Sequence, residues 1–282
     1  MSVLEAAFAA ARARPARVVF PEWEATAQAR SLLVSRGICE PRPVEEADAA
    51  QLSAVMAVRG LDERRAARML TRPMIRGAAM VTAGRAEAMV AGLETPTRRV
   101  IEAALLGIGT APGVAQPSSF FLMVMPDGRE LIFADCAVTV APDAAELAAI
   151  ATASARSAVA LLGTARVALL SYSTGTSGAG PSVDRVAEAA RLSGLPGPVQ
   201  ADAALNAVIG ARKGWHEGAA NTLIFPSLDA GNIAYKLVQE LAGAKAIGPF
   251  LQGFARPVCD LSRGASAEDI VAATAITLML AG

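Results

Sequence analysis

The sequence predicts an α/β protein whose strands form a mostly parallel sheet. Short apolar segments alternate along the chain with alanine-rich stretches of helical character, which is the order that βαβ units require. Hydrophobic residues make up 53% of the composition and charged residues 18%, so the 282 residues can bury a sizeable core. A chain of this length accommodates one large α/β domain or two modest ones.

The expected elements follow one another in that alternating order. Buried strands are expected at 17–20, 88–91, 131–133, 167–172, 222–225 and 246–250. Helices are expected at the N-terminus, at 26–36, 61–83, 144–162, 183–192 and 232–242, and from Glu268 to the C-terminal end. Pro41 and Pro43, followed by acidic residues, indicate a loop, and the pair Pro142-Asp143 indicates both a helix start and a domain boundary.

The charge balance and the cysteine usage exclude several classes of protein. Lysine plus arginine equals aspartate plus glutamate, which argues against a nucleic-acid binder, and the arginines between Arg64 and Arg76 are diluted by Asp62 and Glu63 as on a solvated helix face. Three widely spaced cysteines indicate neither a disulfide framework nor a zinc site. The N-terminus is a poor signal peptide and the apolar run 270–281 is too short to span a bilayer, so we expect a soluble, cytoplasmic protein without a membrane partner.

A single histidine, His216, limits the available chemistry. It lies between Trp215 and Glu217 in a polar stretch, where a surface loop is the expected setting. Serine–histidine catalysis and multi-histidine metal sites therefore have at most one candidate residue.

Three loops at the ends of expected strands are candidate ligand sites, because ligands of open α/β sheets bind there. Loop 171–180 is rich in glycine and hydroxyl groups, and a helix follows it, which favours an anion. It lacks the spacing of a phosphate-binding P-loop, so an ordinary flexible loop is nearly as good an interpretation. Loop 225–232 again joins a strand to a helix. Loop 260–269 contains a serine, an arginine suited to phosphate, and a carboxylate.

Asp269 in the third loop has a purely structural interpretation as well. Ser266 followed by Glu268 and Asp269 is the pattern of a capping box with acids in the first helical turn. The local sequence alone favours this helix-capping role.

Taken together, the three loops resemble the phosphate acetyltransferase (phosphotransacetylase) family of the phosphate acetyl/butyryltransferase superfamily. The family's blocks occur in order as SYSTGTSGAG at 171–180, GPVQADAAL at 197–205, ANTLIFPSLDAGNIAYKLVQ at 220–239, AIGPFLQGFARPV at 246–258 and DLSRG at 260–264. Upstream, FPEWE at 20–24, GRAEAMVAG at 84–92 and FADCAVTVAPD at 133–143 match less closely.

The resemblance implies a two-domain architecture like that of isocitrate and isopropylmalate dehydrogenases, with an interdomain cleft. We expect a first domain from 1–140 plus 265–282, trimmed relative to the family, and a second domain from 141–264. A homodimer is usual for the family. No metal or resident cofactor is implied, because coenzyme A and acetyl-CoA are substrates.

The implied reaction is reversible transfer of an acetyl group between coenzyme A and inorganic phosphate, with acetyl phosphate as the other substrate. Asp269 matches the family's proposed general base for the thiol. Arg263 matches the arginine that binds the phosphoryl group, and Ser262 matches the serine near the reacting thiol and carbonyl. The matching positions for substrate binding are Ser171, Ser173, Thr174, Gly175, Asn232 and Arg99.

The sequence also departs from the family's pattern. Glu240 follows the YKxxQ block where an arginine is usual, Pro196 replaces an aspartate, and Cys259 replaces an asparagine. The usual arginine after Glu22 is missing, and either Arg98 or Arg99 can replace the one that follows the MVAG strand. Two alternatives therefore stay open: a longer acyl group, as in a phosphate butyryltransferase, and a catalytically weakened, non-enzymatic homologue. A decarboxylating dehydrogenase is disfavoured, because no aspartates are spaced as magnesium ligands on one helix.

Overall fold

The computed structural model describes residues 1–281 and divides the chain into two compact units. Unit 1 comprises Met1–Pro117 and the chain from Gly248 onward, and unit 2 comprises Ser118–Ile247. Most strand pairs within the units are parallel, and the antiparallel exceptions are β4 with β5 and β8 with β9. The predicted α/β class with a mostly parallel sheet is therefore confirmed.

Unit 1 is built on strands in the order β2-β1-β3-β9-β8. Its strands are β1 (Arg17–Val19), β2 (Glu40–Arg42), β3 (Ala88–Ala91), β9 (Val258–Asp260) and most of β8 (Lys245–Gln252). Its helices are α1 (Val3–Ala13), α2 (Ala27–Ser35), α3 (Ala49–Arg59), α4 (Glu63–Leu70), α5 (Pro73–Thr82), α6 (Thr97–Gly107) and α12 (Ala267–Leu280).

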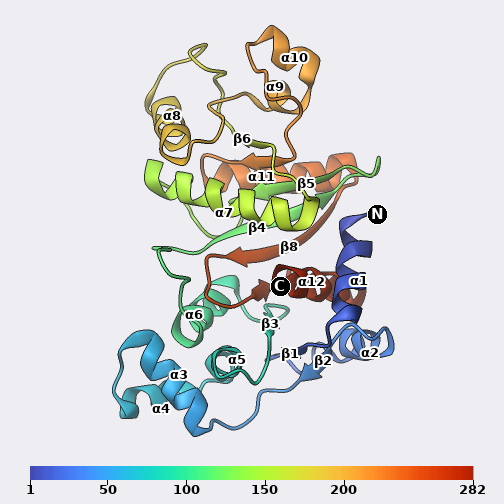
Figure 1. The fold of residues 1–282 in the computed structure, drawn as a ribbon, viewed down its shortest axis with the longest axis vertical. Helices are drawn as coiled ribbons and strands as arrows, with labels where there is room; N and C mark the ends of the chain where they lie inside the picture. Colours follow the sequence, from blue (N-terminus) through green and yellow to red (C-terminus); the bar gives the residue numbers. More distant parts are fainter. Residues whose placement is uncertain (282) are drawn as a thin grey trace. The chain divides into compact units, whose positions relative to one another are not determined.

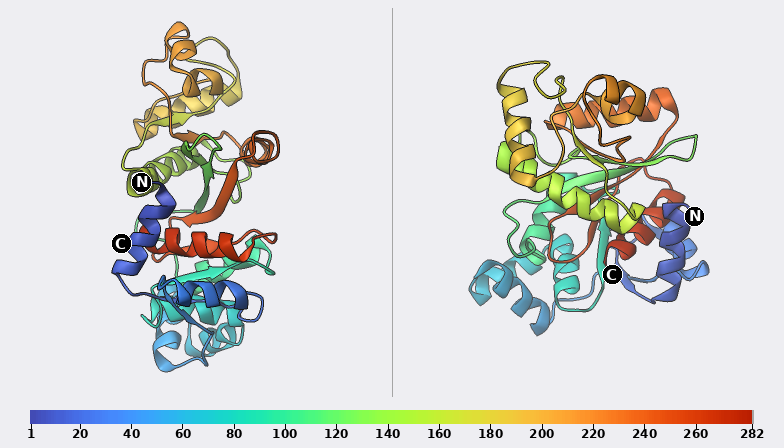
Figure 2. Two further views of the ribbon diagram at one scale, coloured as in Figure 1. Left: turned by 90° about the vertical axis from the view of Figure 1, so that its right-hand side faces the viewer. Right: turned by 45° about the horizontal axis from the view of Figure 1, so that its top comes forward.

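Helices cover both faces of the strands of unit 1. Figure 1 shows α1, α2 and α12 on one side of β1 and β3, with α5 and α6 on the other. The last helix, α12, packs along α1 and α2, and every residue from Ile270 to Thr277 is buried. Both views in Figure 2 keep α12 beside α1. The loop that precedes the C-terminal helix therefore connects β9 to a helix of the core.

Unit 2 is built on strands in the order β4-β5-β7-β6. Its strands are β4 (Ser118–Val124), β5 (Glu130–Ala134), β6 (Val167–Leu169) and β7 (Thr222–Ile224). Its helices are α7 (Ala144–Leu162), α8 (Pro181–Ser193), α9 (Ala201–Leu205), α10 (Ala207–Arg212) and α11 (Leu228–Ala242). Helix α7 packs on the strands and on α8. One hydrophobic core of unit 2 includes Phe121, Phe133, Trp215, Leu223 and Phe225.

Helix α7 is the one described helix that is long and apolar enough to cross a membrane. Its composition is also that of a core helix. It buries Leu147, Ile150, Ala151 and Leu161 within unit 2, and a capping box at Asp143 and Glu146 begins it.

The unit boundaries differ from the expected domain boundaries at both ends of unit 2. Residues 118–140 lie in unit 2 rather than in the first domain, because β4 pairs with β5 and β5 pairs with β7. Residues 248–264 lie in unit 1 rather than in the second domain, because β9 pairs with both β3 and β8. Pairing between strands far apart in sequence therefore decides the division.

Several elements differ from the expected ones. Residues 61–83 form two helices rather than one, because Pro73 begins α5 after Arg72 adopts an extended conformation. The expected loop at Pro41 contains the short strand β2, which lies at the end of the strand order, where proline is tolerated. Strand β4 (Ser118–Val124) and helices α3, α6, α9 and α10 were not expected.

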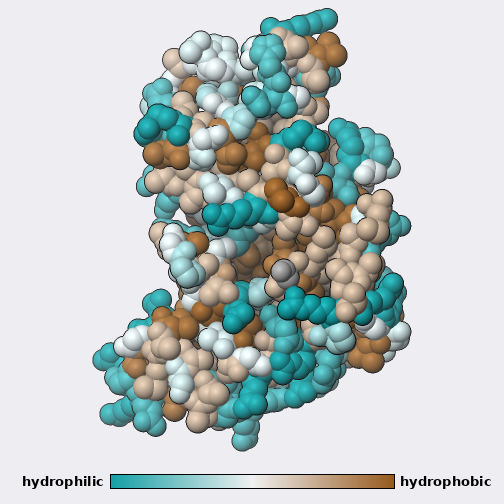
Figure 3. Space-filling model, in the orientation of Figure 1, coloured by the Kyte–Doolittle hydropathy of each residue, from teal (hydrophilic) through white to brown (hydrophobic). Residues whose placement is uncertain are grey.

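The arginines of α4 lie on a solvated helix face, as predicted. Ala66 and Leu70 are buried, whereas Arg64, Arg65 and Arg68 are exposed. The space-filling view shows polar side chains along this corner of unit 1 (Figure 3).

Candidate functional site

The loop after β9 carries Ser262 and Arg263 on the surface of unit 1. Leu261 anchors it: its side chain is buried and its N–H donates to the carbonyl of Ala91 at 2.6 Å. A turn follows, in which the N–H of Ala265 donates to the carbonyl of Ser262 at 2.9 Å. Ser262 and Arg263 are exposed, and within residues 1–281 the guanidinium of Arg263 has no hydrogen-bond or ion-pair partner. This guanidinium is therefore available to an anion.

Asp269 lies in the first turn of α12 and belongs to a capping box with Ser266. Its Oδ2 accepts hydrogen bonds from the N–H of Ser266 at 2.9 Å and from the Ser266 hydroxyl at 2.7 Å. The Ser266 Oγ accepts in turn from the N–H of Asp269 at 3.2 Å. The predicted capping role is thus confirmed. Both bonds to the carboxylate use Oδ2, so Oδ1 stays available to a proton donor from solvent or substrate.

The segment after β3 is held by the carboxylate of Glu22. One oxygen of Glu22 accepts from the N–H groups of Gly92 and Leu93, each at 2.8 Å. The other accepts from the N–H groups of Glu94 at 3.0 Å and Thr95 at 2.6 Å. Four backbone donors on one carboxylate fix the shape of residues 92–95, and therefore also the start of α6, where Arg98 and Arg99 lie.

Asp260 connects this segment to the loop after β9. It pairs in register with Ala91, and its side chain is fully buried. A Cβ built on Gly92 would lie 2.2 Å from Asp260 Oδ1 and 2.8 Å from the nitrogen of Leu261. The segment after β3 and the loop after β9 are thus in contact at Gly92. On the side of β9, this contact directly precedes Ser262 and Arg263 in the sequence.

We expect Gly92→Ala to be strongly destabilising. Gly92 has a φ of 103°, which is unfavourable for an L side chain, and the added methyl group would collide with Asp260 and Leu261. Backbone strain and overpacking each cost about 1–3 kcal/mol. Thermal unfolding should show a clearly lowered Tm. Gly84→Ala is the matched control: Gly84 also has positive φ, at 71°, but nothing lies within 4 Å of its Cβ, so it should cost less. Equal losses in the two variants would contradict the tight contact.

Arg99 lies at the start of α6 beside a second arginine and an ion pair. Arg72 donates to both carboxylate oxygens of Glu102, at 2.9 and 2.8 Å. This pairing raises the pKa of Arg72 and lowers that of Glu102. The four side chains Arg72, Arg98, Arg99 and Glu102 line an open surface cavity of about 600 Å³. Because Arg72 already neutralises the charge of Glu102, the side chains of Arg98 and Arg99 give this cavity a net positive charge.

In unit 2, loop 171–180 is shaped by its own hydroxyl groups. The hydroxyl of Ser173 donates to the carbonyl of Gly175 at 3.0 Å and accepts from the N–H of Gly178 at 2.8 Å. Ser173 is fully buried, so it shapes the loop instead of presenting a hydroxyl at the surface. Its neighbour Thr174 is joined to Gln200, whose N–H donates to the Thr174 hydroxyl at 3.1 Å. Gly175 is exposed, and Ser171 is half-buried.

Asn232 lies near the start of α11, against the segment that follows β5. Its side-chain amide donates to the carbonyl of Cys136 at 3.1 Å. That segment is itself organised by the buried Asp135, which accepts from the Ser119 hydroxyl and from the N–H groups of residues 137–139. Asn232 therefore has a fixed orientation.

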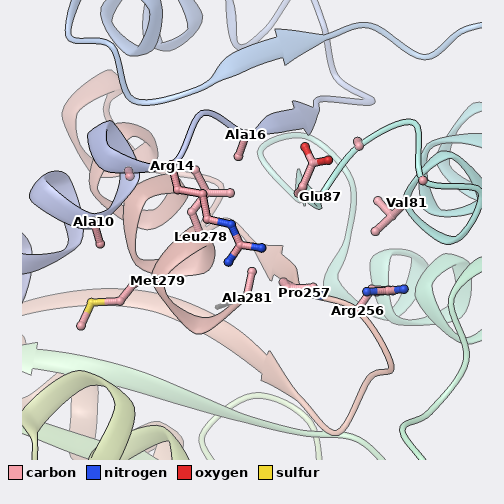
Figure 4. Close-up of a pocket in the computed structure, with 13 residues that line it drawn as sticks. Ala10, Arg14, Ala16, Val81, Glu87, Arg256, Pro257, Leu278, Met279 and Ala281 are labelled. Atoms are coloured by element: carbon pink, nitrogen blue, oxygen red, sulfur yellow. The ribbon is translucent and has the colours of Figure 1, made fainter.

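A further pocket in unit 1 contains none of the predicted site residues. Its volume is about 310 Å³, and it lies at the amino ends of β3 and β9, next to the last turn of α12. Figure 4 shows that mostly small apolar side chains line it, together with the charged side chains of Arg14 and Arg256. Since Ser262 and Arg263 follow the carboxyl end of β9, this pocket lies at the opposite end of the strand from them.

The sequence did not reveal two contributors to this part of unit 1. Glu22 binds a segment 70 residues away, and only its place directly after a buried strand and a proline marks it as unusual. Asp260 looks like an ordinary strand-end acid. His216 is exposed in a loop, as predicted. In the part of the chain that the structure describes, no group of three or more histidine, cysteine, aspartate or glutamate side chains is placed to hold a metal ion.

Comparisons with known proteins identify the class of enzyme. A sequence model of the phosphate acetyl/butaryl transferase family matches residues 39–278. A phosphate acetyltransferase of Paracoccus denitrificans is 39% identical over 315 aligned positions, which cover 99% of each chain. That aligned length exceeds 282 residues, so the relative carries segments that this chain lacks. A phosphotransacetylase structure from Streptococcus pyogenes superposes with a TM-score of 0.91 at 32% identity, covering 99% of this chain and 98% of that one.

The chain therefore belongs to the phosphate acetyl/butaryl transferase family, and it is an acyltransferase. Some relatives are much longer. A phosphate acetyltransferase of Nitrosomonas europaea is 41% identical over 92% of this chain, which spans only 39% of that protein.

Proposed function

We propose that this chain catalyses the reversible transfer of an acetyl group between coenzyme A and inorganic phosphate. The observation that carries the proposal is the likeness to the Paracoccus phosphate acetyltransferase, which extends over 99% of both chains. The substrates are small molecules. Coenzyme A takes part as a substrate, and the proposed reaction uses no metal or resident cofactor.

In the proposed mechanism, the sulfur of coenzyme A attacks the carbonyl carbon of acetyl phosphate. The new C–S bond forms, the bond from carbon to the phosphate oxygen breaks, and inorganic phosphate leaves. A thiol of pKa ~8.5 is mostly protonated at neutral pH, so the attack needs a base. Asp269 takes the thiol proton, and the exposed position of its side chain and its available Oδ1 support that role.

Arg263 binds the phosphoryl group and the charge that develops as phosphate leaves. Its exposed guanidinium is uncommitted within the described residues, which supports this role. Ser262 directly precedes it and donates a hydrogen bond near the thiol and the carbonyl. Arg99 contributes positive charge for the phosphates of the substrates. In unit 2, Ser171, Thr174, Gly175 and Asn232 contact substrate, while Ser173 shapes the loop.

The acyl preference is tested by steady-state kinetics with acetyl-CoA and butyryl-CoA in the presence of phosphate. We expect kcat/KM to favour acetyl-CoA. A preference for butyryl-CoA would assign the chain to the butyryl branch of the family, and inactivity with both would contradict the proposal.

We also propose that the protein is a cytoplasmic homodimer whose copies meet along α11. Ile233, Leu237 and Leu241 recur every four residues on this helix and are 56%, 51% and 82% exposed. Lys236 and Glu240 border the apolar stripe. If a twofold axis pairs two copies of α11 antiparallel about Leu237, Lys236 of one copy lies beside Glu240 of the other, in both directions. Apolar contact and charge are therefore self-complementary. The free cysteines Cys39, Cys136 and Cys259 support the cytoplasmic location.

Replacing the central residue of the stripe should separate the copies. We expect Leu237→Glu to be a folded monomer by sedimentation and circular dichroism, because two buried carboxylates would face each other at the axis. Leu192→Glu, at a comparably exposed leucine of α8, should leave the dimer intact. A monomeric parent protein, or a dimeric Leu237→Glu variant, would refute this interface.

A further inference from the structure

Asp260 is a buried carboxylate for which the proposed reaction has no use. Its exposed fraction is 0%, and neither carboxylate oxygen has a partner of hydrogen-bonding geometry among residues 1–281. Buried carboxylates are normally paired or hydrogen-bonded, because the ionised form is poorly solvated inside a protein. Asp260 is also directly followed by Leu261, Ser262 and Arg263. An unpaired acid at this position is therefore unexpected unless its charge state matters.

The elements packed around Asp260 supply no compensating cation. Gly92 at the end of β3 touches its Oδ1, Thr97 comes from the start of α6, and Glu22 comes from the segment after β1. On its own strand, the neighbouring thiol of Cys259 is buried and has a pKa raised to about 12, so it stays neutral. Among the described residues, the charged group that acts on Asp260 is Glu22, which is itself negative.

These surroundings favour the neutral acid. The pKa of Asp260 is raised to about 7 in total: burial is the largest cause, the charge of Glu22 adds to it, and the Thr97 side chain, which does not reach hydrogen-bonding geometry, opposes it. The carboxylate of Glu22 is meanwhile held by four backbone N–H groups. Ionising Asp260 would thus place a second negative charge in a closed space beside a fixed one.

We propose that Asp260 is a positioning residue that acts as the neutral acid. Packed against Gly92, it holds the carboxyl ends of β3 and β9 together, so that the segments carrying Arg99 and Ser262–Arg263 begin at fixed positions. Ionisation of Asp260 loosens the contact between these strand ends and lowers activity. The catalytic part of this inference rests on the proposed function, whereas the effect on folding does not.

The dependence of stability on pH follows from the direction of the pKa shift. The folded-state pKa of Asp260 lies above the ordinary value of 3.8, so between about pH 4 and pH 7 the folded protein binds a proton that the unfolded chain does not. The contribution of Asp260 to stability therefore falls as pH rises through this window and levels off above it. Asp260→Asn removes this contribution, because the amide does not titrate.

The test compares Asp260→Asn, a neutral replacement of the same shape, with the parent protein. We expect the difference in Tm, variant minus parent, to increase from pH 5 to pH 8. The ratio of variant to parent kcat should also rise at least about threefold between pH 6 and pH 8, as the parent's neutral acid is lost. Taking the ratio cancels the ionisation of coenzyme A. Asp62→Asn, which replaces an exposed helix cap with another good cap, should show neither trend.

The possible failures can be told apart. A kcat ratio that does not change with pH overturns the positioning role, and a constant Tm difference overturns the neutral acid. Absence of acetyl transfer by the parent itself contradicts the proposed function, and the Tm comparison still decides the charge state of Asp260. Should Asp260→Asn fail to fold, infrared spectra of the parent decide. A protonated-carboxyl band that disappears between pH 6 and pH 8 supports the proposal, and no such band at pH 6 refutes it.

Discussion

Asp269→Asn should reduce turnover at least ~10²-fold while leaving the Tm within a few degrees of the parent. The asparagine side-chain oxygen can still accept the N–H of Ser266, so the start of α12 should hold. An amide cannot take up the thiol proton at neutral pH. Turnover at saturating substrate and thermal unfolding measure the two effects separately. The loss should shrink as pH is raised towards the pKa of the thiol, where coenzyme A ionises without help.

Glu268→Gln is the matched control for this variant. Glu268 is an exposed acid in the same helical turn, and it forms an ion pair with Arg36. Its replacement removes one negative charge from the start of α12 without removing the proposed base, so turnover should stay near that of the parent. Parental turnover in Asp269→Asn would leave Asp269 as a helix cap only.

Arg263→Lys should lower turnover by about 10²–10³-fold. Lysine keeps the positive charge but loses the planar pair of donors that binds two phosphate oxygens at once. Because the Arg263 side chain is exposed and has no partner within the described residues, the replacement should leave the Tm unchanged. Initial rates of acetyl-CoA formation at several acetyl phosphate concentrations measure the effect.

Arg256→Lys makes the same chemical change at another exposed arginine of unit 1. Arg256 lines the pocket at the amino ends of β3 and β9, so turnover should be parental. Near-normal turnover in Arg263→Lys would mean that another group binds the phosphate.

The elements that the sequence predicted well are those specified by local signals. Helix α7 has the expected bounds because Asp143 and Glu146 form a capping box and Gly163 ends the helix in the left-handed conformation. Strand β4 was missed, since its residues are buried on both faces and do not alternate in polarity. Strand β2 was missed because Pro41 lies within it. The domain boundaries depended on pairing between distant strands, which no local pattern encodes.

The same distinction applies to the candidate site. The capping box at Asp269 was readable from three neighbouring residues, and the resemblance supplied Ser262 and Arg263. The bonds of Glu22 to residues 92–95 and the burial of Asp260 depend on long-range packing. The hydrogen bonds of the Ser173 hydroxyl within its own loop could not be predicted from the sequence either, because they depend on how that loop folds back on itself.

The most direct measurement of the central claim is product formation by the purified chain supplied with acetyl phosphate and coenzyme A. Acetyl-CoA and inorganic phosphate should appear together in a one-to-one ratio, and adding phosphate to acetyl-CoA should run the reaction backwards. Arg263→Lys, assayed in parallel, should form both products far more slowly. Phosphate release without a matching amount of acetyl-CoA, or no acetyl-CoA at all, would contradict the assignment of this chain as a phosphate acetyltransferase.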